Sequence, residues 1–471
     1  MPFADLRSNG DILLVGEPKV YALIEEMFAA TTACFRTKRI HIGMDEAHDV
    51  QGGRYEQING KQSGFQVMNR HMAEVVKITD RLGLKPMIWS DMYFRIGSKS
   101  GDYYDRSGSV PAEVAEKIPK QIDLVYWDYY HPDAEFYAEW IDRHRAMGKE
   151  PIFAGGAWMW GMLWPNYDIT SLCTRAAMTA CRDRKVREAL VTAWGDNGNE
   201  SDALANLPNL QLFADCAYDE RADDKTHRRQ FAGTTGGTWD AWLLGGLLDR
   251  APGIFSLAET YAINKQALPA AVKAVADGKE NFGPQNPAKY LLWQDPMLGL
   301  YDAHVGRLPL AKHYAKLAKD LAKAVRRSPV DRELLTHGYN LASVLELKAD
   351  LGVRLYDAYH AKGAAKVTRL RELHRKVLPE LAKRVERLYD HHRALWLENN
   401  KSQGWEVLES RYATLLARVR FAHERVGAFL AGRIDQLEEL EEKRQPMHTD
   451  WGTGRLGNCG DYRRMYSPTF T

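Results

Sequence analysis

Two acidic residues, Asp45 and Glu46, stand side by side in the stretch RIHIGMDEAHDV, which covers residues 39–50. Neighbouring residues of a β-strand point to opposite faces, so both carboxylates can serve one site only where the strand ends. Gly43 makes such a break easy, because glycine tolerates backbone conformations that other residues avoid. Two close carboxylates cannot both ionise cheaply, so an acid and an anion can stand together. Glycoside cleavage requires this combination.

Two other interpretations of this stretch remain open at this point. The donor atoms of a metal site are present at tight spacing in His41, Asp45, His48 and Asp49. Their spacing fits no common zinc pattern, and no second histidine cluster supplies further ligands. Alternatively, the two acids only stabilise the N-terminus of a helix that follows them.

Five short apolar runs alternate with helix-period segments between residues 18 and 200, which is typical of βα units with a parallel sheet. The predicted strands are residues 39–45, 85–92, 122–130, 150–158 and 189–196. Each ends in acidic or aromatic residues, and the carboxyl ends of the strands form the active-site face of a β/α barrel. We therefore expect one pocket to collect Asp45, Glu46, Trp89, Asp91, Trp127, Tyr129, Tyr130, Trp158, Trp194 and Asp196. The alternative is that the tryptophans merely fill the mouth of the barrel.

The composition changes beyond residue 300 to long, charged segments with periodic leucines. These segments are residues 309–328, 331–360, 363–396 and 405–443. Their pattern predicts antiparallel helices packed into a bundle. The predicted fold is therefore α/β, with a partial (β/α)8 barrel of about five βα units in residues 1–300 and an all-helical domain in residues 301–471.

The overall composition narrows the class of protein. The 471 residues carry a formal net charge of only +2, which gives no reason to expect nucleic acid or an anionic membrane as a partner. No apolar run approaches the ~20 residues that a membrane-spanning helix needs. Five cysteines without CxxC spacing and the lack of a secretory signal favour a reducing, cytoplasmic location; they are Cys34, Cys173, Cys181, Cys216 and Cys459. Thirteen tryptophans and 22 tyrosines, many beside acids, suit the faces of sugars.

The segment HIGMDEAH resembles the H-x-G-G-D-E motif of family 20 glycoside hydrolases, the β-N-acetylhexosaminidases. Met44 stands where the wider family has its second glycine, and the acid pair is intact. The resemblance extends over essentially the whole chain from residue 11. It includes the segments LVYWDYYH, GKEPIFAGGAWMW, TAWGDNGNE and LLWQDPMLGLYDAH, which look like the bacterial exo-acting subgroup with a helical C-terminal domain.

The resemblance implies substrate-assisted retaining hydrolysis, in which the 2-acetamido oxygen of the substrate attacks the anomeric carbon. Glu46 would act as general acid and then base, and Asp45 would orient the acetamido group. The other residues implied as substrate-binding are His41, Trp89, Asp91, Trp127, Tyr129, Tyr130, Trp158, Trp194 and Asp196. One of the two tyrosines would contact the acetamido oxygen, and no metal or organic cofactor is implied.

The chain departs from the family in its amino-terminal part. The family's acid pair closes the fourth strand of the barrel, yet only 38 residues precede the predicted strand here. Three βα units cannot fit, since each needs roughly 30 residues. We therefore expect strands one to three to be absent, together with the family's sugar-binding arginine. An open half-barrel exposes strand edges, so we expect a second copy of the chain to cover it in a dimer. Two other options are that residues 1–38 rearrange to cover the open side, or that the natural protein is longer than this chain.

Three functions follow from these observations. The first is an exo-β-N-acetylhexosaminidase that releases terminal β-linked N-acetylglucosamine or N-acetylgalactosamine from glycans or glycosides. The second is a non-catalytic or weakly active carbohydrate-binding relative of such enzymes, because strands are missing. The third is a metal-dependent hydrolase.

Overall fold

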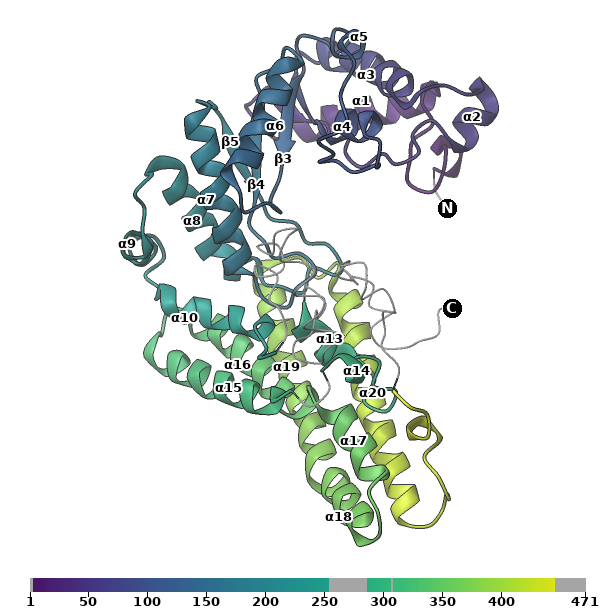
Figure 1. Ribbon diagram of the computed structural model, residues 1–471, viewed down its shortest axis with the longest axis vertical. Helices are drawn as coiled ribbons and strands as arrows, with labels where there is room; N and C mark the ends of the chain where they lie inside the picture. Colours follow the sequence, from purple (N-terminus) through teal and green to yellow (C-terminus); the bar gives the residue numbers. More distant parts are fainter. Residues whose placement is uncertain (1–2, 254–285, 306–307, 445–471) are drawn as a thin grey trace. The chain divides into compact units, whose positions relative to one another are not determined.

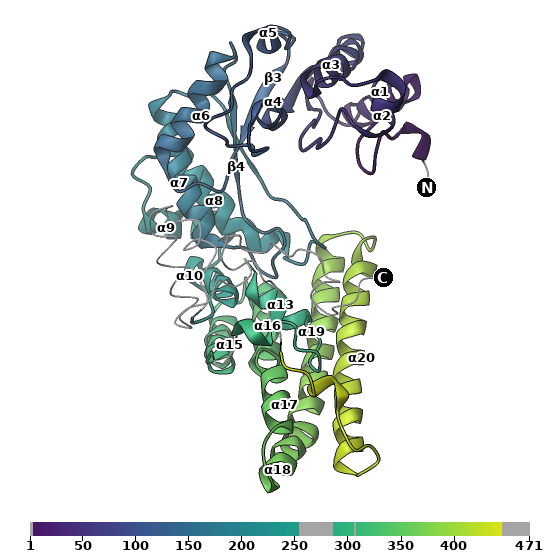
Figure 2. The ribbon, with the colours of Figure 1, turned by 45° about the vertical axis from the view of Figure 1, so that its right-hand side comes forward.

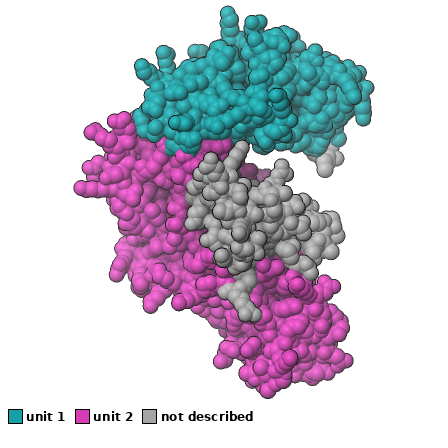
Figure 3. Space-filling view, in the orientation of Figure 1, with its two compact units in different colours: residues 1–129, 133–155, 176–191 teal, residues 130–132, 156–175, 192–471 magenta. Residues whose placement is uncertain are grey.

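The computed structural model describes residues 3–253, 286–305 and 308–444. The chain divides into two compact units, which Figure 3 distinguishes by colour. The first unit comprises residues 1–129, 133–155 and 176–191, and the second comprises residues 130–132, 156–175 and 192–471. The expected domain boundary between residues 300 and 301 stays a prediction.

A single five-stranded sheet forms the centre of the first unit. Its strands are β1 (Arg39–His41), β2 (Lys85–Trp89), β3 (Asp123–Trp127), β4 (Ile152–Gly156) and β5 (Ala189–Thr192), in the spatial order β1-β2-β3-β4-β5. β1, β2, β3 and β4 pair in parallel, with Ile40 opposite Pro86 and Ile88 opposite Leu124. The chain therefore forms part of an α/β barrel, as the sequence predicts. Each strand is shorter than predicted, because the residues at its carboxyl end leave the sheet and enter loops.

The sheet is curved, so its two outer strands approach each other at their amino ends. Arg39 begins β1, Glu188 directly precedes β5, and their guanidinium and carboxylate groups lie 2.5 Å apart. Residues of β3 and β4 are almost completely buried, whereas β1 and β5 are partly exposed. This gradient is expected for the wall of an incomplete barrel, in which only the central strands have a neighbour on both sides.

An α-helix precedes the first strand of the first unit, and the others connect its successive strands (Figure 1). They are α1 (Pro18–Thr32), α2 (Gly53–Asn59), α3 (Gly64–Arg81), α4 (Asp91–Gly97), α5 (Ala112–Ala115) and α6 (Ala134–Ala146), followed by α7 (Tyr167–Asp183), which crosses from the second unit into the first. A capping box between Ser63 and Gln66 fixes the start of α3. Met72 and Val76 of α3 then pack on Ile88 in the main core of this unit. Burying such apolar side chains stabilises the fold by about 1.5–3 kcal/mol each.

The second unit is mainly helical. Its helices are α8 (Leu207–Tyr218), α9 (Asp224–Thr235), α10 (Trp239–Leu243), α13 (Pro287–Trp293), α14 (Asp302–Val305), α15 (Leu310–Arg327), α16 (Arg332–Lys348), α17 (Leu351–Tyr359), α18 (Ala364–Glu372), α19 (Leu378–Asn399) and α20 (Trp405–Leu430). A π-helical segment, Leu373–Val377, joins α18 to α19. The long helices α19 and α20 lie side by side (Figure 2). The helical bundle predicted beyond residue 300 is confirmed for the described residues.

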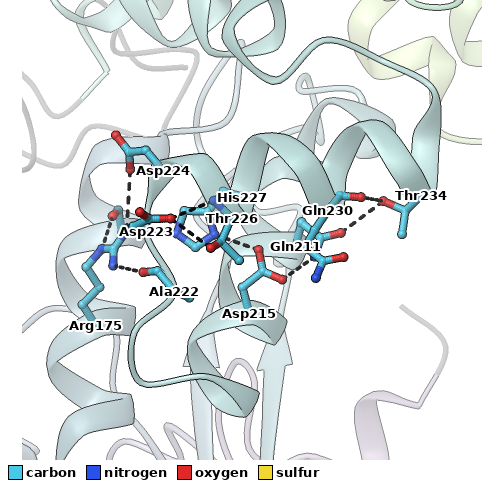
Figure 4. A network of polar contacts seen from close by, with 11 residues as sticks. Arg175, Gln211, Asp215, Ala222, Asp223, Asp224, Thr226, His227, Gln230 and Thr234 are labelled. Atoms are coloured by element: carbon cyan, nitrogen blue, oxygen red, sulfur yellow. Dashed lines mark hydrogen bonds and ion pairs between the residues drawn. The ribbon is translucent and has the colours of Figure 1, made fainter.

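A polar network joins α7, α8 and α9 within the second unit (Figure 4). The fully buried His227 lies 2.7 Å from Asp215 through Nδ1, and Arg175 donates to its Nε2 at 3.0 Å. Because arginine can only donate, Nε2 accepts and Nδ1 carries the proton that goes to Asp215. All three side chains use their polar atoms to hold helices together, which is a structural role.

The described part of the chain has neither a disulfide nor a helix that could span a membrane. No disulfide links Cys34, Cys173, Cys181 or Cys216, and Cys459 lies outside the described residues. None of the described helices has the length and hydropathy needed to span a membrane.

An apolar groove of about 430 Å³ lies beside β1 in the first unit. Residues of α1, α3 and the end of β1 line it, among them Leu23, Met27, Ile42 and Met44. Met27 is 56 % exposed although it is a large apolar side chain. In the described residues β1 has only β2 as a neighbour in the sheet, so the groove continues an open sheet edge. The expected second copy over this face stays a prediction.

Replacing Met27 tests that association. If a second copy covers the groove, the wild-type protein has twice the mass of one chain in solution, and Met27→Lys weakens the dimer at least about tenfold, because a charge is then buried against apolar surface. Sedimentation over a range of concentrations measures both. Ile58→Lys, at an equally exposed apolar position on α2 outside the groove, serves as the control. A wild-type protein that stays monomeric at all concentrations contradicts the expectation.

Candidate active site

The backbone leaves the sheet abruptly after β1 and presents the acid pair in a loop. β1 ends at His41, and Gly43, Met44 and Glu46 have positive φ angles of 74°, 73° and 48°. Left-handed conformations are costly for side chains other than glycine, so other contacts must hold this loop. Both Asp45 and Glu46 are exposed. The predicted break at Gly43 is confirmed, and it makes both carboxylates accessible to a ligand.

The buried carboxyl group of Asp91 holds the loop in place. Asp91 follows β2, is only 6 % exposed, and its Oδ2 accepts a hydrogen bond of 2.9 Å from the backbone N–H of Glu46. The side chain of Trp127, at the end of β3, also donates to it. Asp91 therefore connects residues at the carboxyl ends of three adjacent strands.

The protonation of Asp91 is shifted into the neutral range. Burial raises its pKa to about 7, and the negative charge of Asp45 adds to the rise, while the hydrogen bonds from Glu46 and Trp127 oppose it. Desolvation disfavours the ionised form of a buried carboxyl group. The burial of Asp91 and its bond to Glu46 suit a role in positioning the loop, and the substrate contact expected from the sequence stays a prediction.

A tyrosine that sequence reasoning did not select contacts the glutamate. Tyr103 lies in the loop between α4 and α5, and its hydroxyl donates to Oε1 of Glu46 at 3.4 Å. The same hydroxyl contacts Nε2 of His48, so the three polar groups form a chain. Arg95 lies over the ring of Tyr103, 5.2 Å from its centroid. Its signal in the sequence is the pair of adjacent tyrosines, Tyr103 and Tyr104, which lie outside the predicted strand ends.

The loop that carries Tyr103 is ordered by its own hydrogen bonds. The Asp105 carboxylate accepts from the hydroxyl and backbone groups of Ser98 and Ser107 and their neighbours, which lowers its pKa. Tyr104 donates to the backbone oxygen of Trp127 at 2.6 Å. These contacts hold the chain on both sides of Tyr103, and such preorganisation is what catalytic groups need.

Aromatic rings from neighbouring strand ends surround this loop. The rings of His41 and Trp89 lie 4.2 Å apart, and Trp127 stacks on Tyr129 at 5.4 Å. Nδ1 of His41 accepts from the backbone N–H of Gly43, and burial lowers the pKa of His41 to about 4. A neutral His41 thus supports the turn at Gly43. The first unit therefore brings together seven of the predicted site residues: His41, Asp45, Glu46, Trp89, Asp91, Trp127 and Tyr129.

The remaining four predicted residues, Tyr130, Trp158, Trp194 and Asp196, belong to the second unit. Trp158 packs edge-on against Tyr130 at 5.5 Å and stacks on Trp160 at 4.1 Å. Trp160 was not selected from the sequence, although it lies two residues after Trp158. The backbone oxygen of Asp196 accepts from the N–H of Gly161, which links the loops that follow β4 and β5. Substrate binding by these four residues stays a prediction.

The residues considered as metal ligands are not arranged for that purpose. Within residues 3–253, 286–305 and 308–444, no group of three or more His, Cys, Asp or Glu side chains is placed to hold a metal ion. His41 instead contacts Gly43, and His48 contacts Tyr103.

Comparison with known proteins gives a family match in the helical part of the chain. Residues 265–456 match the family model described as the Glycoside Hydrolase 20C C-terminal domain. No curated protein matches this sequence.

Two solved structures are similar at low sequence identity. A GH138 enzyme, described as targeting pectin rhamnogalacturonan II, has a TM-score of 0.41 at 11 % identity; the match covers 90 % of this chain and 68 % of that one. The chitobiase of Flavobacterium johnsoniae has a TM-score of 0.32 at 14 % identity, with 79 % of this chain and 58 % of that chain covered. This chain thus spans less than two thirds of the chitobiase.

The raised pKa of Asp91 predicts a pH-dependent effect of Asp91→Asn on stability. The folded protein holds the proton of Asp91 up to about pH 7, whereas the ordinary pKa is 3.8. The contribution of Asp91 to stability is therefore complete below pH 3.8 and is lost as the pH rises through 7. Asparagine cannot ionise, so the variant should gain unfolding free energy relative to wild type, on the order of 4 kcal/mol between pH 4 and pH 8.

Urea unfolding at several pH values measures this difference. Asp80→Asn, at an exposed acid on α3, is the control and should show little pH dependence relative to wild type. An Asp91→Asn difference that does not change with pH would mean that Asp91 is not the buried titrating group.

Proposed function

We propose that this chain is an exo-β-N-acetylhexosaminidase, because residues 265–456 match the Glycoside Hydrolase 20C C-terminal domain. It would hydrolyse terminal β-linked N-acetylglucosamine or N-acetylgalactosamine with retention of configuration. The observation that carries the proposal is the exposed Asp45–Glu46 pair, whose loop is fixed by the buried Asp91 and flanked by Trp89 and Trp127.

In the proposed mechanism, Glu46 is the group that handles protons. Its carboxyl group donates to the leaving oxygen as the glycosidic bond breaks, and its carboxylate then removes a proton from the attacking water. Tyr103 supports this role, because a hydroxyl that donates to Oε1 holds the carboxyl group in one orientation. The backbone of Glu46, held by Asp91, limits how far the group can move.

Asp45 would act on the 2-acetamido group of the substrate. Its carboxylate accepts the acetamido N–H and orients the carbonyl oxygen for attack on the anomeric carbon. Its negative charge also stabilises the positively charged cyclic intermediate. Trp89 and Trp127 supply apolar faces beside the pair, which suits a sugar ring and an acetamido methyl group. The proposal uses no metal or organic cofactor.

The rival proposal, a carbohydrate-binding relative with little or no activity, is favoured by one observation. The sheet of the described residues has five strands and an open edge at β1, next to the strand end that carries the acid pair. A binding protein of this kind would take up N-acetylglucosamine without turnover at any pH.

Substitution of the acid tests the proposed function. Glu46→Gln should lower the hydrolysis of an aryl N-acetyl-β-glucosaminide by at least about 10²-fold, because the amide can neither donate the proton nor accept one. A thiazoline mimic of the cyclised intermediate should inhibit the wild-type protein. Glu74→Gln on α3 is the matched control and should keep full activity. An unchanged rate in Glu46→Gln refutes the assignment, and saturable sugar binding without turnover in the wild type supports the rival.

A second substitution tests the role of Tyr103. Tyr103→Phe should lower kcat on the order of tenfold with little change in KM, because the loss affects the positioning of the acid and not the sugar contacts. Tyr93→Phe removes a hydroxyl that donates to Asn69 and is the control. Equal kcat values in the two variants contradict a contribution of Tyr103 to the chemistry.

A further inference from the structure

The loop after β5, residues 193–200, has a strained backbone. Asn197, Gly198 and Asn199 have consecutive φ angles of 64°, 112° and 51°. Three left-handed residues in a row persist only where surrounding contacts over-determine them. This loop carries Trp194 and Asp196, two of the residues that the family resemblance implies as sugar-binding.

A buried ionic cluster holds the end of this loop within the second unit. The Glu200 carboxylate lies 2.6 Å from Nζ of Lys289 on α13 and 2.7 Å from Nη1 of Arg411 on α20. The side chains of Glu200 and Lys289 are each 1 % exposed, and that of Arg411 is 8 % exposed. Trp293 donates its indole N–H to Glu200 at 2.7 Å. Two helices of the second unit thus bind one loop residue.

The two cations also bind the strained part of the loop directly. The backbone oxygen of Asn197 accepts from Lys289 at 3.0 Å and from Arg411 at 2.9 Å. Both buried cations therefore use this carbonyl dipole as an acceptor beside the Glu200 carboxylate, and buried charges are costly when such partners are lost. If the loop moved away, Lys289 and Arg411 would both lose this acceptor. The position of the loop is therefore coupled to the ionic cluster.

Gly198 allows the close approach that this arrangement needs. A Cβ atom at this position would collide with the guanidinium group of Arg411. Glycine also tolerates the φ of 112° that other residues rarely adopt. The backbone of the loop is thus fitted to the arginine.

We propose that Arg411, together with Lys289 and Glu200, positions the loop of Trp194 and Asp196 for sugar binding. Helices α13 and α20 thereby act on substrate affinity, although neither Lys289 nor Arg411 needs to touch the sugar. This inference rests on the proposed function, because Trp194 and Asp196 would bind a sugar only in an enzyme of the family that the sequence resembles.

Arg411→Met provides the test, because it removes the arginine and leaves Lys289 and Glu200 as a neutral pair. It should raise KM for the aryl N-acetyl-β-glucosaminide about tenfold and change kcat less than about threefold, as expected when binding common to ground and transition state is lost. Amide hydrogens of residues 193–199 should exchange faster in the variant.

Arg418→Met is the matched control. Arg418 lies two turns further along α20 and pairs with the buried Asp295 outside the loop. Its substitution should lower the melting temperature without changing KM or exchange in residues 193–199. Equal effects of the two variants on KM and on exchange, or no effect of Arg411→Met on either, overturn the inference.

Two further measurements keep the test decisive. If Arg411→Met does not fold, Gly198→Ala replaces it, because the added methyl group pushes the loop away from Arg411 without changing a charge. The same rise in KM and in amide hydrogen exchange is expected. Wild-type values of both quantities refute the inference. If the wild type hydrolyses no substrate, the proposed function fails, and hydrogen exchange still decides whether Arg411 holds the loop.

Discussion

The hydrogen bond between the Asp91 carboxyl group and the backbone N–H of Glu46 is the contact on which the candidate site depends. Glu46 lies in a loop with left-handed residues, which has no regular hydrogen-bonding pattern of its own to maintain its shape. Asp91 supplies a fixed acceptor from the next strand and receives a second bond from the strand beyond it. The cost is a carboxyl group buried away from water, which is visible in its raised pKa. The parallel sheet makes this possible, because it brings consecutive strand ends to the same edge.

Much of this arrangement could be predicted from the sequence. The alternation of apolar runs and helical periods located all five strands, and the leucine periodicity located the long helices beyond residue 300. Gly43 correctly marked the break after β1, because a glycine before paired acids has a specific conformational use. These features are local in the sequence, and local patterns report secondary structure well.

The roles of individual side chains were harder to predict, because they depend on contacts between distant segments. The sequence places Asp91 at a strand end and predicts an accessible acid, yet the fold buries it beside Glu46, which is 45 residues away in sequence. Tyr103 lies in a loop without periodicity, and contacts such as the bond of Tyr104 to the end of β3 bring it to the glutamate. Glu200 and Arg411 are 211 residues apart, so no sequence pattern could join them. Polar partners of this kind are set by tertiary packing.

The same principle operates in both units, where a strained loop after a strand is held by buried polar groups. In the first unit a carboxyl group binds the backbone of Glu46, and in the second an ionic cluster binds the backbone of Asn197. The candidate catalytic acid is thus exposed on a loop that is itself firmly anchored. This combination of an accessible side chain and a fixed backbone is what precise proton transfer requires.

The participation of the substrate's own acetamido group is the central chemical claim, and one rate comparison tests it most directly. Hydrolysis should be measured with an aryl N-acetyl-β-glucosaminide and with the matching N-trifluoroacetyl substrate, whose carbonyl oxygen is a much weaker nucleophile. If the acetamido oxygen attacks the anomeric carbon while Asp45 and Glu46 assist, kcat/KM should fall by several orders of magnitude in the fluorinated substrate. Equal rates for the two substrates would contradict substrate-assisted hydrolysis at this site.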